Sequence, residues 1–260
     1  PGSPIAYWIS DSFIDIFVRE ESLGAHIAAR QGLASGDNYR FLRYLWEVDF
    51  RLVGASCSNA DEGRRLGKKW FPLNKGGLYR RWYGNWEYVI AYDQESRDAL
   101  KALGNHLPSE QLYFQPSVSW SDITSSINSF RYFPAGFIFD ATGHSAFPAN
   151  NKDRNVLLCY CNSKFVNLMS KVLNPTLHFH VGYFNVLPYP SRLFTNDYLG
   201  KYAQLFSELI SLARADWDNF ETSWDFRDQP LLRTGLKEAT LEASWRNWEP
   251  QSTVAIRRMQ

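Results

Sequence analysis

Positive charges gather between residues 64 and 81, in a stretch that contains no acidic side chain. The window holds seven cations, which are Arg64, Arg65, Lys68, Lys69, Lys75, Arg80 and Arg81. The whole chain has a net charge of only +1, so this concentration is local. Because lysine and arginine neutralise phosphates and release the counterions condensed on them, these residues are candidates for gripping a nucleic-acid backbone.

A glycine-bearing turn lies inside this cationic window. Asn74 and Lys75 precede Gly76 and Gly77, and the sequence NKGG is typical of a hairpin turn whose bare backbone can approach a phosphate. The two-stranded ribbon that such a turn would join fits a major groove, with Tyr79 close to the turn. A solvated sheet edge, which lysine and arginine protect from aggregation, is the alternative that the sequence leaves open.

Two further polar segments could contact bases. The segment 117–134 supplies Ser119, Trp120, Ser121, Asn128 and Arg131, and the segment 32–43 adds Arg40 and Arg43. Hydroxyl groups contact phosphates and base edges, asparagine suits adenine and arginine suits guanine. Helix caps and ordinary turns also use such residues. We therefore treat Asn74, Tyr79 and the five residues of 117–134 as candidates either for base readout or for supporting the residues that read.

Several kinds of chemistry are missing from the sequence. It contains no GxGxxG or Walker loop, no Pro–Pro dipeptide of the kind that holds a flipped base in amino-methyltransferases, no HExxH and no nucleophile elbow. We therefore predict no catalytic and no cofactor-binding residue in this chain. His178 and His180 share one face of an expected strand, but no third ligand is apparent, so no metal site is predicted. The acidic residues of 216–228 favour a solvated face or a docking surface over a catalytic carboxylate pair.

Cysteine usage and hydropathy bear on the environment of the protein. Cys57, Cys159 and Cys161 are odd in number and form no CxxC pair, which argues against a disulfide framework or a zinc site and favours a reducing cytosol. No apolar run approaches the length needed to cross a bilayer. We therefore expect a cytoplasmic protein without a membrane partner.

Periodicity predicts an α+β fold, with a mixed, mostly antiparallel sheet, packed helices and a long helical extension. Helices are expected at 5–18, 155–172 and 196–220, with the second ending before Pro175, and the last residues resemble the start of another helix. Strands are expected at 45–52, 115–123, 135–140 and 176–190, together with two or three antiparallel strands over 69–92. Residues 54–67 are expected to form a loop, and residues 93–111 a connection with a short helix.

Five ordered motifs resemble the PglX family, the adenine-specific DNA methyltransferases of BREX phage-defence systems, which are related to single-chain restriction–modification enzymes. The motifs are GLASGDNYRFLRYLWEV, KKWFPLNKGGLYRRWYGNWEYVI, VSWSDITSSINSFRYFPAGFIFDATGHSAFP, CNSKFVNLMSKVLNPTLHFHVGYFNVLPYP and DWDNFETSWDF. The resemblance implies a fragment of a longer enzyme, whose S-adenosylmethionine-binding catalytic domain lies upstream. It further implies a junction helix at 1–28, a recognition domain for double-stranded DNA at 29–190, and a helical spacer with the start of the next helix at 191–260.

Two other functions remain open at this level. The helix at 196–220 and its acidic end could form a protein–protein docking module for other defence-system subunits, with the basic residues merely solvated. A hydrolytic fragment is the second alternative, although no metal-binding carboxylate constellation supports it. Binding to DNA separates the first alternative from a recognition domain, because a docking module would ignore DNA.

Overall fold

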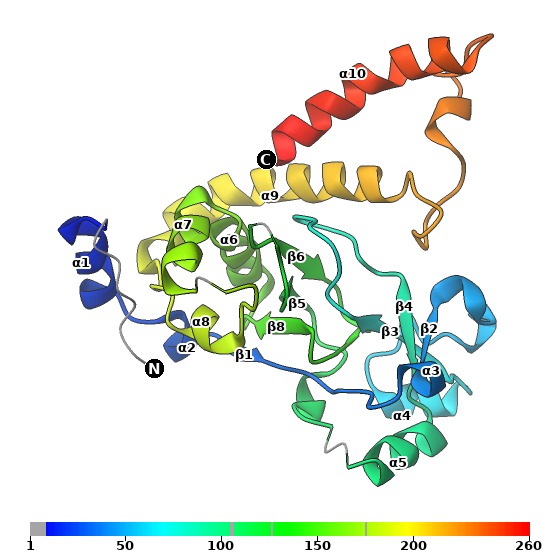
Figure 1. The fold of residues 1–260 in the computed structure, drawn as a ribbon, viewed down its shortest axis with the longest axis horizontal. Helices are drawn as coiled ribbons and strands as arrows, with labels where there is room; N and C mark the ends of the chain where they lie inside the picture. Colours follow the sequence, from blue (N-terminus) through cyan, green and yellow to red (C-terminus); the bar gives the residue numbers. More distant parts are fainter. Residues whose placement is uncertain (1–8, 105–106, 126, 175) are drawn as a thin grey trace.

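The computed structural model describes residues 9–104, 107–125, 127–174 and 176–260 (Figure 1). Its α-helices are α1 Asp11–Arg19, α2 Leu23–His26, α3 Asn38–Phe41, α4 Ala60–Arg65, α5 Gln94–Ala102, α6 Asn151–Cys161, α7 Lys164–Leu173, α8 Val181–Asn185, α9 Asn196–Trp217 and α10 Leu241–Met259. The 3-10 helices are η1 Leu45–Glu47, η2 Phe50–Leu52, η3 Glu110–Leu112, η4 Ser191–Phe194 and η5 Pro230–Leu232. The part of the expected helix 5–18 that precedes residue 9 lies outside the described residues.

The strands form two four-stranded sheets within the described residues. The strands are β1 Ala28–Arg30, β2 Leu42–Tyr44, β3 Trp70–Asn74, β4 Tyr88–Ala91, β5 Ser117–Ser121, β6 Phe130–Phe133, β7 Ile138–Phe139 and β8 Gly143–Phe147. The first sheet has the order β1-β8-β5-β6 and is antiparallel throughout. The second has the order β2-β4-β3-β7, and its only parallel pair is β3 with β7. The predicted α+β class with mostly antiparallel sheets is confirmed.

Each sheet has its own hydrophobic core. Helices α6, α8 and α9 pack around the first sheet, and Trp120 of β5, Leu157 of α6 and Phe184 of α8 are fully buried in this core. The second sheet buries Phe71, Leu73 and Ile90. Strands β7 and β8 follow each other in the chain and join the two sheets into one body (Figure 1).

The expected tight hairpin at NKGG is wrong. Strand β3 does pair with β4, but the register joins Leu73 to Tyr88, so the residues 75–87 form one long connection between them. Gly76 and Gly77 have positive φ values of 75° and 115°, and a Cβ at Gly76 would lie 2.7 Å from the carbonyl oxygen of Thr142. The glycines therefore turn the connection against the other sheet and do not fold it back on β3.

The expected strand at 45–52 is also wrong, because local hydrogen bonds replace a strand ladder. The Glu47 carboxylate accepts from the backbone N–H of Tyr44 at 2.7 Å and closes η1. Asp49 accepts from the backbone N–H of Arg51 at 2.9 Å and closes η2. Alternation of apolar residues could not reveal these two turns, and it also failed to reveal α4 inside the expected loop 54–67.

The expected single helix at 155–172 is two helices. Ser163 caps α7 by accepting from the Val166 N–H at 3.2 Å, while the Asn162 side chain bonds both main-chain polar groups of Phe130 at 2.9–3.0 Å. The predicted end before Pro175 is confirmed, since α7 stops at Leu173. The expected strand at 176–190 is wrong, because its middle forms α8.

The helical extension was predicted correctly as α9 followed by α10. Leu209, Ala213 and Trp217 of α9 are buried in the core of the first sheet, so this helix is packed on the body. Helix α10 returns and lies with its C-terminal end against α9, where Arg258 Nε is 2.6 Å from Glu208 Oε1, while its other end stands away (Figure 1). No helix in the described part of the chain is both long and apolar enough to cross a bilayer.

Candidate nucleic-acid interface

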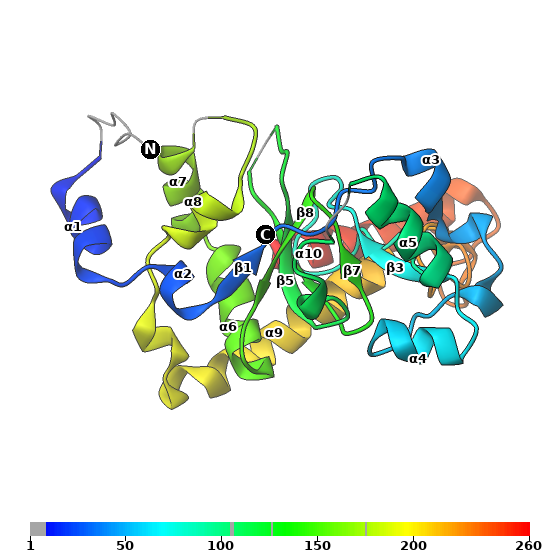
Figure 2. The same ribbon diagram turned by 90° about the horizontal axis from the view of Figure 1, so that it is seen from below.

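The cations of residues 64–81 do not form one continuous surface. Arg64 and Arg65 lie on α4, which Figure 2 shows on the opposite side of β3 from α3. Arg64 pairs with Asp61 at 3.0 Å, and Lys68 Nζ donates to the backbone oxygen of Arg51 at 2.6 Å. Because a strand rises about 3.3 Å per residue, Lys69 before β3 is about 20 Å from Lys75 after it.

Lys75 lies at the junction of the two sheets. Its ammonium group forms an ion pair with Asp140, a carboxylate that is only 2% exposed and also accepts from the N–H and hydroxyl of Thr142 at 2.7 Å. The sequence around Lys75 contains no acidic residue, and its acidic partner Asp140 is 65 positions away in the chain. Because its charge is neutralised and its side chain is held by Asp140, we assign Lys75 the role of fixing the junction of the two sheets at the candidate interface.

Arg80 and Arg81 point to the helical extension. Arg80 donates to the Asp216 carboxylate at 2.8 Å, and its guanidinium lies 4.8 Å from the Trp217 ring centroid. Arg81 donates at 2.8 Å to the backbone oxygen of Gln260. Both side chains therefore fasten α9 and the end of α10 to the body in this structure.

Arg80→Ala is expected to loosen this junction by about 1–2 kcal/mol, because it removes a partly buried charge-assisted hydrogen bond and a cation–π contact. Hydrogen exchange at the amides of residues 213–220 should become faster. Arg246→Ala removes an exposed ion pair with Glu242 and serves as the control, with little expected change. Equal exchange in the two variants would contradict the role of Arg80.

Three of the candidates for readout or support are buried and have internal partners. Asn74 is 1% exposed, and its amide donates to the Ser119 hydroxyl and to the Gly143 carbonyl at 2.5 and 3.0 Å. The Trp120 indole N–H donates to the Phe179 carbonyl at 2.8 Å, and its ring stacks on Phe184 at 4.7 Å. We assign Asn74, Ser119 and Trp120 to support, because none of them can touch a ligand in this conformation.

Arg131 is also fully buried. Its guanidinium donates to the Ser121 hydroxyl at 3.0 Å and to the Arg80 carbonyl at 3.3 Å, so it joins β5 to the connection 75–87. Burial lowers the pKa of Arg131 to about 10, and the nearby Glu87 partly offsets that effect. The side chain stays charged at neutral pH and acts as an internal fastener.

An aromatic stack lines a cleft of about 530 Å³ between α3, β2 and Lys75. Tyr44 stacks on Trp46 with centroids 4.6 Å apart and rings 5° from parallel, and it contacts Tyr88 at 4.7 Å. Tyr39, at the rim, is 95% exposed. Burial and the hydrogen bond to Tyr44 raise the pKa of Tyr88, so its hydroxyl stays neutral. The sequence pattern did not reveal this stack, because the alternation around Trp46 indicated a strand.

Of the charged residues, Arg43, Lys75 and Glu47 line this cleft, and Arg40 lies beside it on α3. Arg43 donates to the carbonyl groups of Tyr39 and Leu42 at 2.6 Å each, and Arg40 lies 5.0 Å from the Phe41 ring centroid. Among the described residues neither guanidinium is paired with a carboxylate. With the Lys75–Asp140 pair neutral and the Glu47 carboxylate also in the lining, the two arginines leave one net positive charge beside the exposed aromatic rings.

A second cleft of about 330 Å³ lies on the other side of the connection 75–87. It is lined by Tyr79, Ser121 and Asn128 with neighbouring hydroxyl groups, and the Ser121 hydroxyl donates to the Gly77 carbonyl at 2.8 Å. Three of the predicted readout candidates thus meet at one site, although Tyr79 and Asn128 are 49 positions apart in the sequence. Amide and hydroxyl groups in such a cleft match the donors and acceptors of base edges.

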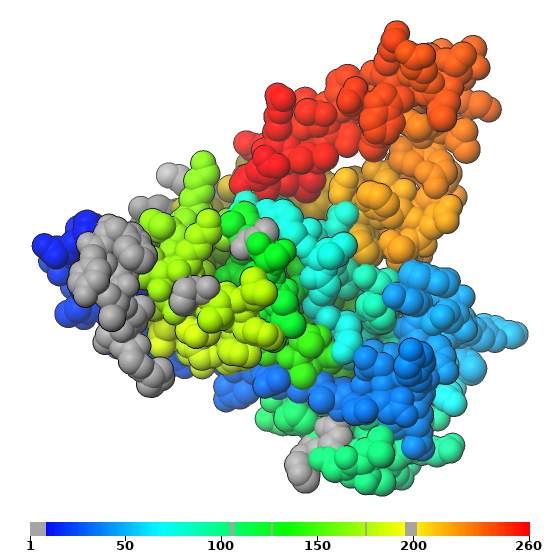
Figure 3. Space-filling view, in the orientation of Figure 1, coloured from blue at the N-terminus to red at the C-terminus, as the bar shows by residue number. Residues whose placement is uncertain are grey.

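The two clefts share one face of the molecule, which we call the loop face and define as residues 38–47, 75–79, 121–125 with 127–129, and 176–180. Figure 3 shows these segments side by side in blue, cyan, green and yellow-green. The contacts agree, since the Thr124 N–H donates to the Leu177 carbonyl at 2.9 Å. Arg64 and Arg65 lie away from this face.

Comparison with known proteins gives the segment a context. No family model matches the chain. The adenine-specific methyltransferase BrxX of Escherichia coli O9:H4 (strain HS) is 36% identical over 253 residues, which are 96% of this chain and 20% of that protein. The adenine-specific methyltransferase PglX of Lacticaseibacillus casei (strain Zhang) is 33% identical over 265 residues, which are 97% of this chain and 21% of that protein. The chain therefore spans about one fifth of the length of these relatives.

Proposed function

Because this chain is homologous along nearly its whole length to one segment of the BrxX and PglX adenine-specific methyltransferases, we propose that it recognises double-stranded DNA for such an enzyme. The observation that carries the proposal is the aromatic cleft with Arg43 in its lining and Arg40 beside it on α3. Guanidinium groups that have no carboxylate partner among the described residues suit phosphates, and exposed rings suit stacking against bases or sugars.

A division of labour follows from the chemistry of adenine methylation. The target base must leave the helical stack before its amino nitrogen can reach a methyl donor. In this proposal the remainder of the enzyme binds S-adenosylmethionine and transfers the methyl group. The loop face holds the duplex beside the displaced base, and the second cleft, with Tyr79, Ser121 and Asn128, contacts base edges.

The direct test is binding of the chain to a fluorescent duplex of about 30 base pairs at 50–200 mM salt. We expect an affinity that falls linearly on a log–log plot with a slope of about −2 or steeper, since at least two phosphates are neutralised. Single-stranded DNA of the same sequence is the matched competitor. Absence of binding at 50 mM salt, or a slope near zero, would remove the loop face from consideration as a DNA surface.

A docking role is a second candidate, favoured by the exposed apolar side chains of α10. Leu241 and Val254 are 71% and 67% exposed, and Trp245 contacts Trp248 at 5.1 Å. The acidic residues at the end of α9 are weaker evidence for docking than they were in the sequence. Arg214 pairs with Asp225 at 2.7 Å, so part of this negative charge is neutralised within the chain. A chain that ignores DNA but retains another defence-system subunit through α10 would favour this candidate.

A further inference from the structure

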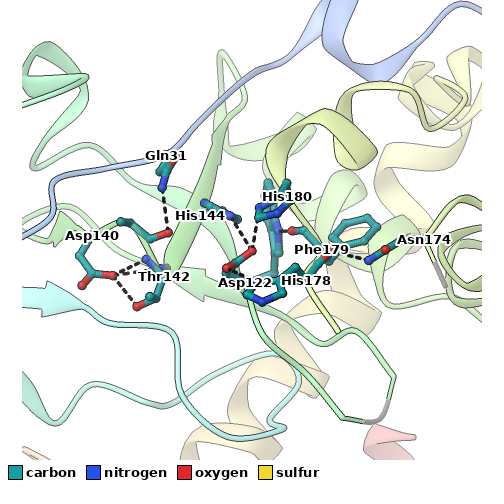
Figure 4. Close-up of polar contacts among 12 residues, drawn as sticks. Gln31, Asp122, Asp140, Thr142, His144, Asn174, His178, Phe179 and His180 are labelled. Carbon is teal, nitrogen blue, oxygen red and sulfur yellow. Dashed lines mark hydrogen bonds and ion pairs between the residues drawn. The ribbon is translucent and has the colours of Figure 1, made fainter. Parts of the chain in front are cut away.

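Three histidines converge on one carboxylate at the edge of the loop face (Figure 4). His178 Nδ1 is 2.9 Å from Asp122 Oδ2, and His180 Nδ1 is 3.0 Å from Asp122 Oδ1. His144 approaches the same carboxylate from the protein interior, with its Nε2 3.2 Å from Oδ1. The sequence showed His178 and His180 but no third ligand. In the fold, Asp122, which is 56 positions from His178, lies next to both histidines.

The backbone fixes this arrangement. Asp122 follows β5, and its carbonyl accepts from the Phe179 N–H at 2.7 Å. Phe179 is 1% exposed, so its side chain anchors the segment in the core while the two neighbouring histidines turn outward together. Their rings lie 5.4 Å apart and only 19° from parallel. Both Nδ1 atoms therefore face Asp122 without any rearrangement of the chain.

The ligand set has the composition and exposure of a metal site. One oxygen of Asp122 and one nitrogen from each of His178 and His180 all lie within 4.8 Å of one another. An ion about 2.0–2.2 Å from each ligand atom fits such a triangle after small side-chain shifts. The carboxylate is 11% exposed, whereas the imidazoles are 48% and 59% exposed, so an ion has access from solvent.

The environment of the carboxylate also suits a ligand. His144 is 2% exposed and donates to Asp122 from inside, as groups behind metal ligands commonly do.

We propose that Asp122, His178 and His180 bind one divalent transition-metal ion, with Zn²⁺ as the first candidate. Two imidazole nitrogens and one carboxylate oxygen are ligands that zinc accepts, and they leave a fourth position for water or another ligand. The ion would join the loop 121–125 to the segment 176–180. It would thereby rigidify the edge of the second cleft, and no catalytic step is assigned to it.

The experiment is a titration of the chelator-treated chain with ZnCl₂, followed by isothermal calorimetry and thermal unfolding. We expect one equivalent to bind, and Tm to rise by about 5 °C at a free zinc concentration 100 times Kd. His178→Ala and His180→Ala should each weaken binding at least roughly 10-fold. Asp122→Asn preserves the size of the side chain and should weaken binding as much.

The control is His26→Ala. His26 lies on α2 and faces Glu21, so it should leave zinc affinity unchanged. The proposal is overturned if no stoichiometric binding occurs below about 100 μM zinc, or if the double variant of His178 and His180 binds as the parent does. The readout does not use DNA, so its failure is distinct from failure of the proposed DNA recognition.

Discussion

Arg131→Ala is expected to lower the free energy of unfolding by about 3 kcal/mol and Tm by roughly 6–10 °C. The substitution leaves a cavity at a fully buried position and removes the donors that hold the Ser121 hydroxyl and the Arg80 carbonyl. It also takes a positive charge away from the partly buried Glu87, whose pKa is already raised by desolvation. Denaturant unfolding followed by far-UV circular dichroism measures the effect.

Two variants sharpen this test. Arg131→Lys keeps the charge but cannot reproduce the planar fork of donors, so an intermediate loss of stability is expected. Arg40→Ala removes an exposed arginine and should change stability by less than about 0.5 kcal/mol. If Arg131→Ala unfolds like the parent and instead alters which duplex is preferred, Arg131 reads DNA and the internal role assigned to it is wrong.

The residues that were predicted well are those whose role depends on nearby sequence. The long stripe of α9 identified that helix, and Pro175 marked the end of α7 within two residues. Strand β5 fell inside its expected range of 115–123. In these segments periodicity and a helix-breaking residue agree with the tertiary environment, so local pattern was sufficient.

The missed features depend on contacts between distant parts of the chain. The cationic window holds no acid in sequence, yet Asp140 and Asp216 reach Lys75 and Arg80 from 65 and 136 residues away. The third potential ligand of His178 and His180 is similarly remote. Neither composition nor spacing encodes which loops the two sheets bring together, so the division of the cations between two sides of the molecule could not be predicted.

That division yields the sharpest test of the DNA proposal. Arg40→Glu combined with Arg43→Glu should weaken duplex binding about 100-fold at low salt and reduce the magnitude of the salt slope by about 2, because two phosphate contacts are replaced by repulsion. Fluorescence anisotropy over a salt series measures both quantities. Under the proposed function, a full-length methyltransferase that carries this segment should lose adenine methylation of host DNA when the same pair is introduced, as read by long-read sequencing.

Arg64→Glu combined with Arg65→Glu is the matched control, since it makes the same change of charge on α4, which lies on the opposite side of β3 from α3. Lys69 does not suit this purpose, because Lys69 and Arg43 both lie 5.7 Å from the centroid of the Trp70 ring. Screening at 150 mM salt confines a surface charge to about 8 Å, so this pair should cost less than about 3-fold in affinity there. If the control pair weakens duplex binding more than the Arg40 and Arg43 pair does, the DNA-binding surface lies on the β3–α4 side. The aromatic cleft then has no role in binding.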